Sequence, residues 1–92
     1  MKPLSDNEIK EKLANLSGWN IDGKKLTKRY KFKNFMQSLE FVNKVGELAE
    51  SHNHHPDIEF GWGYAVITFT THDAGGLTKL DFKLAMEVDS LN

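Results

Sequence analysis

The chain has 92 residues, a formal net charge of −1 and no cysteine. This length predicts one domain over residues 1–92, and the small charge creates no field that attracts nucleic acid or an anionic membrane. Without cysteine there is no disulfide framework and no thiolate chemistry. No apolar run approaches the ~20 residues that span a bilayer, and the first residues lack the apolar run of a signal peptide. We therefore expect a cytoplasmic protein.

The first third of the chain predicts a helix followed by a β-hairpin. Ser5-Asp6-Asn7-Glu8 has the form of a capping box, and an apolar stripe at helical spacing follows it. Residues 19–32 alternate as two strands around Asp22-Gly23, a preferred two-residue turn. Lys28 interrupts the otherwise apolar face of the second strand.

The longest predicted helix lies in the middle of the chain. It begins after Asn34, a good N-cap, and must end before Pro56, since the residue before a proline is disfavoured in the α region. Its apolar stripe contains Phe35, Leu39, Val42 and Ala49 and is widened by Phe41, Val45 and Leu48. Gly46 costs this helix about 1 kcal/mol relative to alanine, which the close approach of another backbone would explain.

The last third predicts a second hairpin and a final helix. The hairpin runs from Asp57 to Thr71 around Gly61-Trp62-Gly63, and a second capping box begins at Thr78. The order of elements is therefore α-β-β-α-β-β-α. We expect an α+β fold in which a four-stranded antiparallel sheet carries three helices packed on one face.

All four histidines lie at the two ends of the second hairpin. His52, His54 and His55 precede it, and His72 follows it. A tight hairpin brings the start of one strand beside the end of its partner, so His54 and His55 should meet His72 at one edge of the sheet. Three interpretations of the histidines remain open. They could be solvated side chains that interact favourably with a helix dipole, ligands of a metal site, or an acid–base pair. The H-x-H-H spacing is poor for one tetrahedral metal site, because adjacent residues usually point apart.

Other polar residues near this edge allow a functional and a purely structural interpretation. Glu50 could orient a histidine or be a solvated charge at a helix end. Thr70 and Thr71 could hydrogen-bond a ligand or simply reflect strand propensity. The turn from Thr71 to Gly76 combines Thr, His and Asp with two glycines. We expect it to expose backbone N–H groups beside an acid–base side chain, which would suit a polar heterocycle.

With these residues the chain resembles the pterin-4a-carbinolamine dehydratases, also called 4a-hydroxytetrahydrobiopterin dehydratases. The resemblance covers nearly the whole chain and is carried by Glu50, His54-His55-Pro56, the run from Thr71 to Thr78, and Asp81. It implies dehydration of a 4a-hydroxytetrahydropterin to the quinonoid dihydropterin, a step in tetrahydrobiopterin recycling. It also implies a small-molecule pterin substrate, no metal and no cofactor.

The resemblance implies residue roles as well. His54, His55 and His72 are the expected catalytic residues, with His54 and His72 as the proton-transfer pair and His55 as the residue that orients the pterin. The expected substrate-binding residues are Glu50, His54, His55, Pro56, Thr71, His72, Asp73 and Ala74. Neither histidine of the pair is assigned as acid or base, and His52 lies outside the motif. Ile58 stands where some relatives have an aromatic residue, so Phe60 or Trp62 is the alternative aromatic surface.

We also expect a homodimer or homotetramer. Members of the family form such assemblies, and a small core, a broad apolar helix and free sheet edges point the same way. Three other functions stay open: a protein-binding dimerisation or coactivator module, a protein that acts on another pterin, and a metal-binding protein. Nothing in the sequence identifies a partner surface for the first of these.

Overall fold

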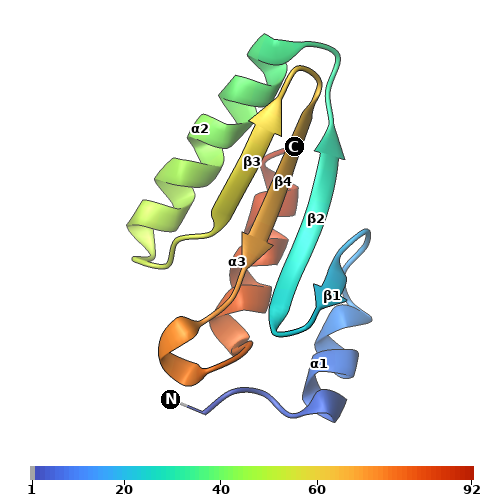
Figure 1. The fold of residues 1–92 in the computed structure, drawn as a ribbon, viewed down its shortest axis with the longest axis vertical. Coiled ribbons are helices and arrows are strands. Elements are labelled where there is room, and N and C mark those ends of the chain that lie inside the picture. The colour runs from blue at the N-terminus through green and yellow to red at the C-terminus, as the bar shows by residue number, and fades with distance from the viewer. Residues whose placement is uncertain (1) are drawn as a thin grey trace.

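The computed structural model describes residues 2–92 and confirms the predicted order of elements. These are α1 (Asp6–Leu13), β1 (Asn20–Asp22), β2 (Lys25–Lys31), α2 (Phe35–Ser51), β3 (Asp57–Gly61), β4 (Tyr64–Phe69), the short 3₁₀ helix η1 (His72–Ala74) and α3 (Lys79–Ser90). The four strands form one antiparallel sheet in the order β1-β2-β4-β3. Helices α2 and α3 lie across one face of it, as Figure 1 shows, and α1 closes one end. None of the described helices combines the length and the apolar character needed to cross a membrane.

The hydrophobic core lies between the sheet and the helices. Ala65, Ile67 and Phe69 of β4 are buried on the side of the sheet that faces the helices. Strand β2 adds Leu26 and Tyr30 to this layer. Helix α3 covers it with four buried residues, Phe82, Leu84, Ala85 and Val88. The alternating apolar residues of the strands and the apolar residues at helical spacing in α3 therefore pack together in one layer.

The turn of the first hairpin lies one residue later than the sequence predicted. Asp22 pairs with Lys25, so the two loop residues are Gly23 and Lys24 rather than Asp22 and Gly23. Gly23 has a φ of 60°, and a type II′ hairpin turn places glycine at its first central position because φ is positive there. This register places Lys24 at the tip of the hairpin.

The buried side of α2 also differs from the prediction. Its buried residues are Ser38, Phe41, Val45 and Ala49, whereas Phe35 at the start of the expected stripe is 44% exposed. The rest of the chain thus covers only part of the apolar surface of α2. An added Cβ at Gly46 would meet nothing within 4 Å, so no other element among residues 2–92 makes the close approach that was expected at this glycine.

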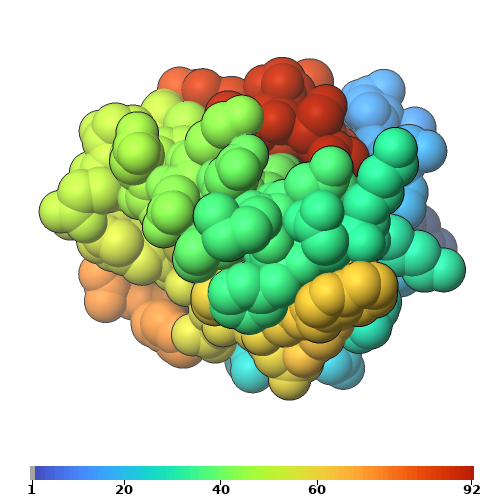
Figure 2. Space-filling view, turned by 90° about the horizontal axis from the view of Figure 1, so that it is seen from above, coloured from blue at the N-terminus to red at the C-terminus, as the bar shows by residue number. Residues whose placement is uncertain are grey.

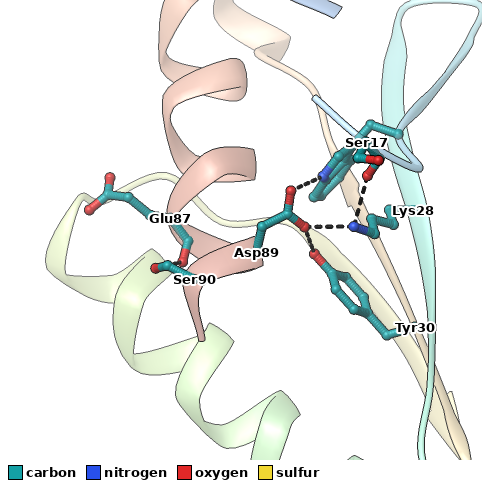
Figure 3. Close-up of polar contacts among 7 residues, drawn as sticks. Ser17, Lys28, Tyr30, Glu87, Asp89 and Ser90 are labelled. Carbon is teal, nitrogen blue, oxygen red and sulfur yellow. Dashed lines mark hydrogen bonds and ion pairs between the residues drawn. The ribbon is translucent and has the colours of Figure 1, made fainter. Parts of the chain in front are cut away.

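Lys28 reaches through the core face to a carboxylate on α3. Its ammonium donates to Asp89 Oδ1 and to the carbonyl of Ser17, at 2.8 Å each. Trp19 Nε1 donates to Asp89 Oδ2 at 3.0 Å, and the Tyr30 hydroxyl also donates to Asp89 (Figure 3). These contacts, which we call the Asp89 cluster, tie the end of α3 to β2 and to the segment before β1.

The Asp89 cluster shifts the pKa values of two of its members. Burial alone would raise the pKa of Asp89, but hydrogen bonds from Lys28, Tyr30 and Trp19 outweigh it and lower the pKa below its ordinary value of 3.8. Burial, followed by the hydrogen bond to Asp89, raises the pKa of Tyr30 well above its ordinary value. The cluster therefore holds a charged carboxylate and a neutral phenol.

Replacement of Asp89 by asparagine should destabilise the fold by about 1–3 kcal/mol at pH 7, because three donors lose a charged acceptor. A lowered pKa stabilises the folded state above the ordinary value of 3.8, and this contribution is lost as the pH falls through the lowered pKa. Urea unfolding between pH 7 and pH 3 measures both effects. Asp89→Asn should flatten the acid side of the stability profile, whereas Glu47→Gln, on the exposed side of α2, should not. Equal profiles for the two variants would contradict this role of Asp89.

Candidate functional site

The candidate site is a hollow of about 280 Å³ at the end of the sheet opposite the β3–β4 turn. The connection from α2 enters β3 there, and the chain leaves β4 into η1 at the same end (Figure 1). The residues that line the hollow are Asn53, His54, His55, Thr70, Thr71, His72 and Asp73. The antiparallel pairing of β3 with β4 thus brings together the three histidines that the sequence predicted to meet.

A reversal of the chain after α2 sends two adjacent histidines in different directions. Helix α2 ends at its C-cap, His52, and Asn53 follows with a φ of 50°, in the left-handed region that asparagine tolerates better than most residues. The backbone N–H of His54 then returns to the carbonyl of Ala49 at 3.1 Å. As a result, the side chain of His54 is 13% exposed, whereas that of His55 is 55% exposed.

The His54 ring is held by a buried carboxylate. Its Nε2 lies 2.6 Å from Oδ1 of Asp81, a residue with no exposed surface. A carboxylate only accepts, so Nε2 carries the proton, and Nδ1 of the neutral ring has a free lone pair. The ring also lies parallel to Phe69, with 7° between the planes and 6.1 Å between the centroids. Tautomer and orientation of His54 are therefore both fixed.

The second oxygen of Asp81 joins two more segments to the same carboxylate. Oδ2 accepts from the Thr71 hydroxyl at 2.7 Å and from the Thr78 backbone N–H at 2.9 Å. The hydroxyls of Thr71 and Thr78 lie 3.0 Å apart. We call these three residues, together with His54, the Asp81 network. The sequence predicted Asp81 as part of a capping box and of the motif, but it gave no sign of the contact with His54.

Glu50 contacts a different histidine from the one in the Asp81 network. Its Oε2 lies 2.6 Å from Nε2 of His55, and both side chains are more than half exposed. An exposed ion pair contributes little, so His55 is held less firmly than His54. His52 does not line the hollow: its Nδ1 lies 3.1 Å from the Leu48 carbonyl and its Nε2 lies 3.5 Å from Glu87.

His72 begins η1 and is exposed to solvent. Among residues 2–92, no side chain or backbone group forms a hydrogen bond with its ring. The backbone N–H groups of Ala74, Gly75 and Gly76 all donate inside the turn, so the expected exposure of backbone donors is wrong for these three residues. Strand β4 ends at Phe69, two residues before the predicted end of the hairpin at Thr71.

The remaining predicted residues divide between the hollow and its surroundings. Thr71 and Asp73 line it, but the Thr71 hydroxyl is already used in the Asp81 network. Pro56 and Ala74 do not line it. Asn53 lines the hollow without having been predicted, and Thr70, for which the sequence left a ligand contact open, lines it as well. The chain from residue 2 to residue 92 brings together no group of three His, Asp or Glu side chains that could hold a metal ion.

The geometry suits the movement of protons on a bound ligand. One imidazole has a fixed tautomer with a carboxylate behind it, and a second imidazole on the same hollow has no protein partner for its ring among residues 2–92. One can accept a proton while the other donates one, provided that a ligand lies between them.

Asp81→Asn should lower the free energy of unfolding by about 1–3 kcal/mol, because an amide cannot accept from all three donors that the carboxylate serves. Asp73→Asn removes an exposed charge at the same hollow and should change stability by less than about 0.5 kcal/mol. Urea denaturation measures both. Nitrogen NMR of the imidazole rings should show the Nε2–H tautomer of His54 in the wild type, because a carboxylate only accepts. The Nδ1–H tautomer in the wild type would contradict the assigned contact.

Comparison with known proteins identifies a family that this chain matches over nearly its whole length. The family model described as pterin 4 alpha carbinolamine dehydratase matches residues 2–91. A Nostoc sp. protein is 49% identical over 97% of this chain and 96% of its own length. A Rubrobacter xylanophilus protein is 50% identical over 97% of this chain and 84% of its own length. Both carry the name "Putative pterin-4-alpha-carbinolamine dehydratase".

Two solved structures are similar as well. A transcriptional coactivator/pterin dehydratase from Brucella melitensis has a TM-score of 0.92 and 32% identity, with 98% of each chain covered. A pterin dehydratase-like protein identified as a RuBisCO assembly factor in the alpha-carboxysome has a TM-score of 0.69 and 31% identity, with 82% of this chain and 89% of that chain covered. The fold thus occurs in proteins that are named for different roles.

Proposed function

We propose that this chain, which belongs to the pterin 4 alpha carbinolamine dehydratase family, converts 4a-hydroxytetrahydropterins to quinonoid dihydropterins and water in the cytoplasm. Recycling of tetrahydrobiopterin is the proposed setting. The observation that carries the proposal is the pair formed by His54, backed by Asp81, and His72 on one hollow. In the reaction the C4a hydroxyl gains a proton and leaves as water, and a ring N–H loses a proton. No electrons are exchanged, so two proton-transfer groups suffice.

The contacts of the two histidines favour different roles. Nδ1 of neutral His54 has a free lone pair, and the Asp81 carboxylate behind the ring compensates the positive charge that forms when Nδ1 takes a proton. We therefore assign His54 as the base that removes the ring proton. His72, exposed and without such a carboxylate, is the acid that protonates the leaving hydroxyl. His55 with Glu50 orients the pterin at the rim of the hollow.

His54→Ala and His72→Ala should each reduce kcat/KM for dehydration by about 10²–10⁴-fold, which is the usual contribution of one acid–base group. His52→Ala is the matched control, because this histidine lies outside the hollow, and it should retain nearly full activity. The absorbance of a freshly generated 4a-hydroxytetrahydropterin follows the reaction, with circular dichroism to verify folding. Wild-type protein that does not exceed the rate in buffer would overturn the proposal.

We also propose that the chain forms a homo-oligomer through the end of α2 that lies far from the hollow. Phe35 and Met36 are 44% and 58% exposed there, Trp62 of the β3–β4 turn is 71% exposed, and the rings of Phe35 and Phe60 lie 5.9 Å apart. Figure 2 shows the start of α2 beside the β3–β4 turn on one face of the molecule. Large apolar side chains gathered in this way typically mark an interface.

Sedimentation velocity at about 10 µM should show a dimer or tetramer for the wild type. Met36→Glu places a charge in the proposed interface and should shift the protein to smaller species, because burial of an unpaired charge is costly. Met86→Glu is the matched control: Met86 is 57% exposed on α3, away from this end of α2, and its replacement should leave the assembly unchanged. A monomeric wild type, or equal effects of the two variants, would contradict the proposed interface.

A further inference from the structure

A second hollow, of about 470 Å³, lies directly beside the candidate site. The two hollows share Thr70, Thr71 and His72, so His72 stands on the wall between them. The hollow beside the α2–β3 connection, at about 280 Å³, is slightly smaller than the roughly 300–1,000 Å³ typical of small-molecule sites. A ligand whose ring lies between His54 and His72 therefore has room for a substituent in the second hollow.

The second hollow is lined by the tip of the β1–β2 hairpin and by the turn after β4. Its lining residues are Asp22, Gly23, Lys24, Lys25, Thr70, Thr71, His72, Gly75 and Gly76. The Thr70 hydroxyl donates to the carbonyl of Lys24 at 2.6 Å, which fixes the hairpin tip against the strand end. This contact uses only the backbone of Lys24 and leaves its ammonium free to bind a ligand.

The charges in this hollow are not balanced. Lys24 and Lys25 contribute two ammonium groups and Asp22 contributes one carboxylate. Within residues 2–92, neither lysine forms an ion pair, and Asp22 forms none either. The hydroxyls of Thr70 and Thr71 are already used as donors to Lys24 and Asp81. The donors left for a ligand are therefore mainly cationic, and they match an anion better than a neutral polyol.

We propose that the second hollow selects pterins whose ring substituent carries an anionic group, with a phosphate ester as the simplest case. This inference rests on the proposed function, because it assumes that the pterin ring occupies the hollow of the three histidines. Lys24 and Lys25 bind the anion, and Asp22 limits the affinity. The specificity residues thus lie on the first hairpin, outside the motif that carries the family resemblance.

Fluorescence titration with 6-hydroxymethylpterin and with its phosphate ester tests this selection without turnover. The affinity for the ester should be at least about fivefold higher than that for the parent, because each exposed ion pair contributes up to about 1 kcal/mol. The double substitution Lys24→Ala/Lys25→Ala should remove this preference and leave the affinity for the parent unchanged. Lys31→Ala/Lys44→Ala is the matched control, because it changes the net charge equally and neither residue lines either hollow.

Two further measurements sharpen the test. Asp22→Asn removes the one carboxylate of the hollow and should tighten binding of the ester about two- to fivefold with no effect on the parent. Raising the salt concentration from about 0.02 M to about 0.5 M should reduce the preference for the ester, since exposed charges are screened. Equal affinities for ester and parent, or equal losses in the two double variants, would overturn the anion site while the dehydratase assay still shows activity. If neither pterin binds and no dehydration occurs, the proposed function fails together with this inference.

Discussion

The buried carboxylate of Asp81 is the constraint on which the site depends. A carboxylate with no exposed surface is costly unless donors surround it, and here three donors from three segments do so. His54 comes from the link between α2 and β3, Thr71 from the segment after β4, and Thr78 from the start of α3. Loss of any one contact leaves part of a buried charge without compensation, so the three segments are held together where the hollow forms.

The Asp89 cluster plays a similar part at the other end of α3. Asp81 fixes the first turn of this helix and Asp89 the last, while the residues between them supply the apolar side that covers the sheet. With both ends attached, α3 cannot slide along the sheet without breaking charged hydrogen bonds. The position of His54 therefore depends on the register of α3, because the ring is bonded to that helix although His54 itself lies in the link between α2 and β3.

Local patterns in the sequence were enough to predict the order of elements and the meeting of the three histidines. The hairpin follows from alternation and turn residues, and antiparallel pairing then places His54 and His72 at one end. The same patterns missed the contact between Asp81 and His54, because the capping box already explained Asp81 completely. One oxygen serves the cap and the other serves a residue 27 positions away, which no local pattern can reveal. Lys28 in an apolar face was a visible sign of a distant acid, but it did not identify Asp89.

The hollow and the exposed apolar end of α2 lie at opposite ends of the β3–β4 hairpin. His54 precedes β3 and His72 follows β4, whereas Trp62 belongs to the turn that joins these strands. A partner that covers Phe35, Met36 and Trp62 would leave the three histidines open to a ligand. The proposed catalysis and the proposed association therefore do not compete, since they are assigned to different ends of the same hairpin.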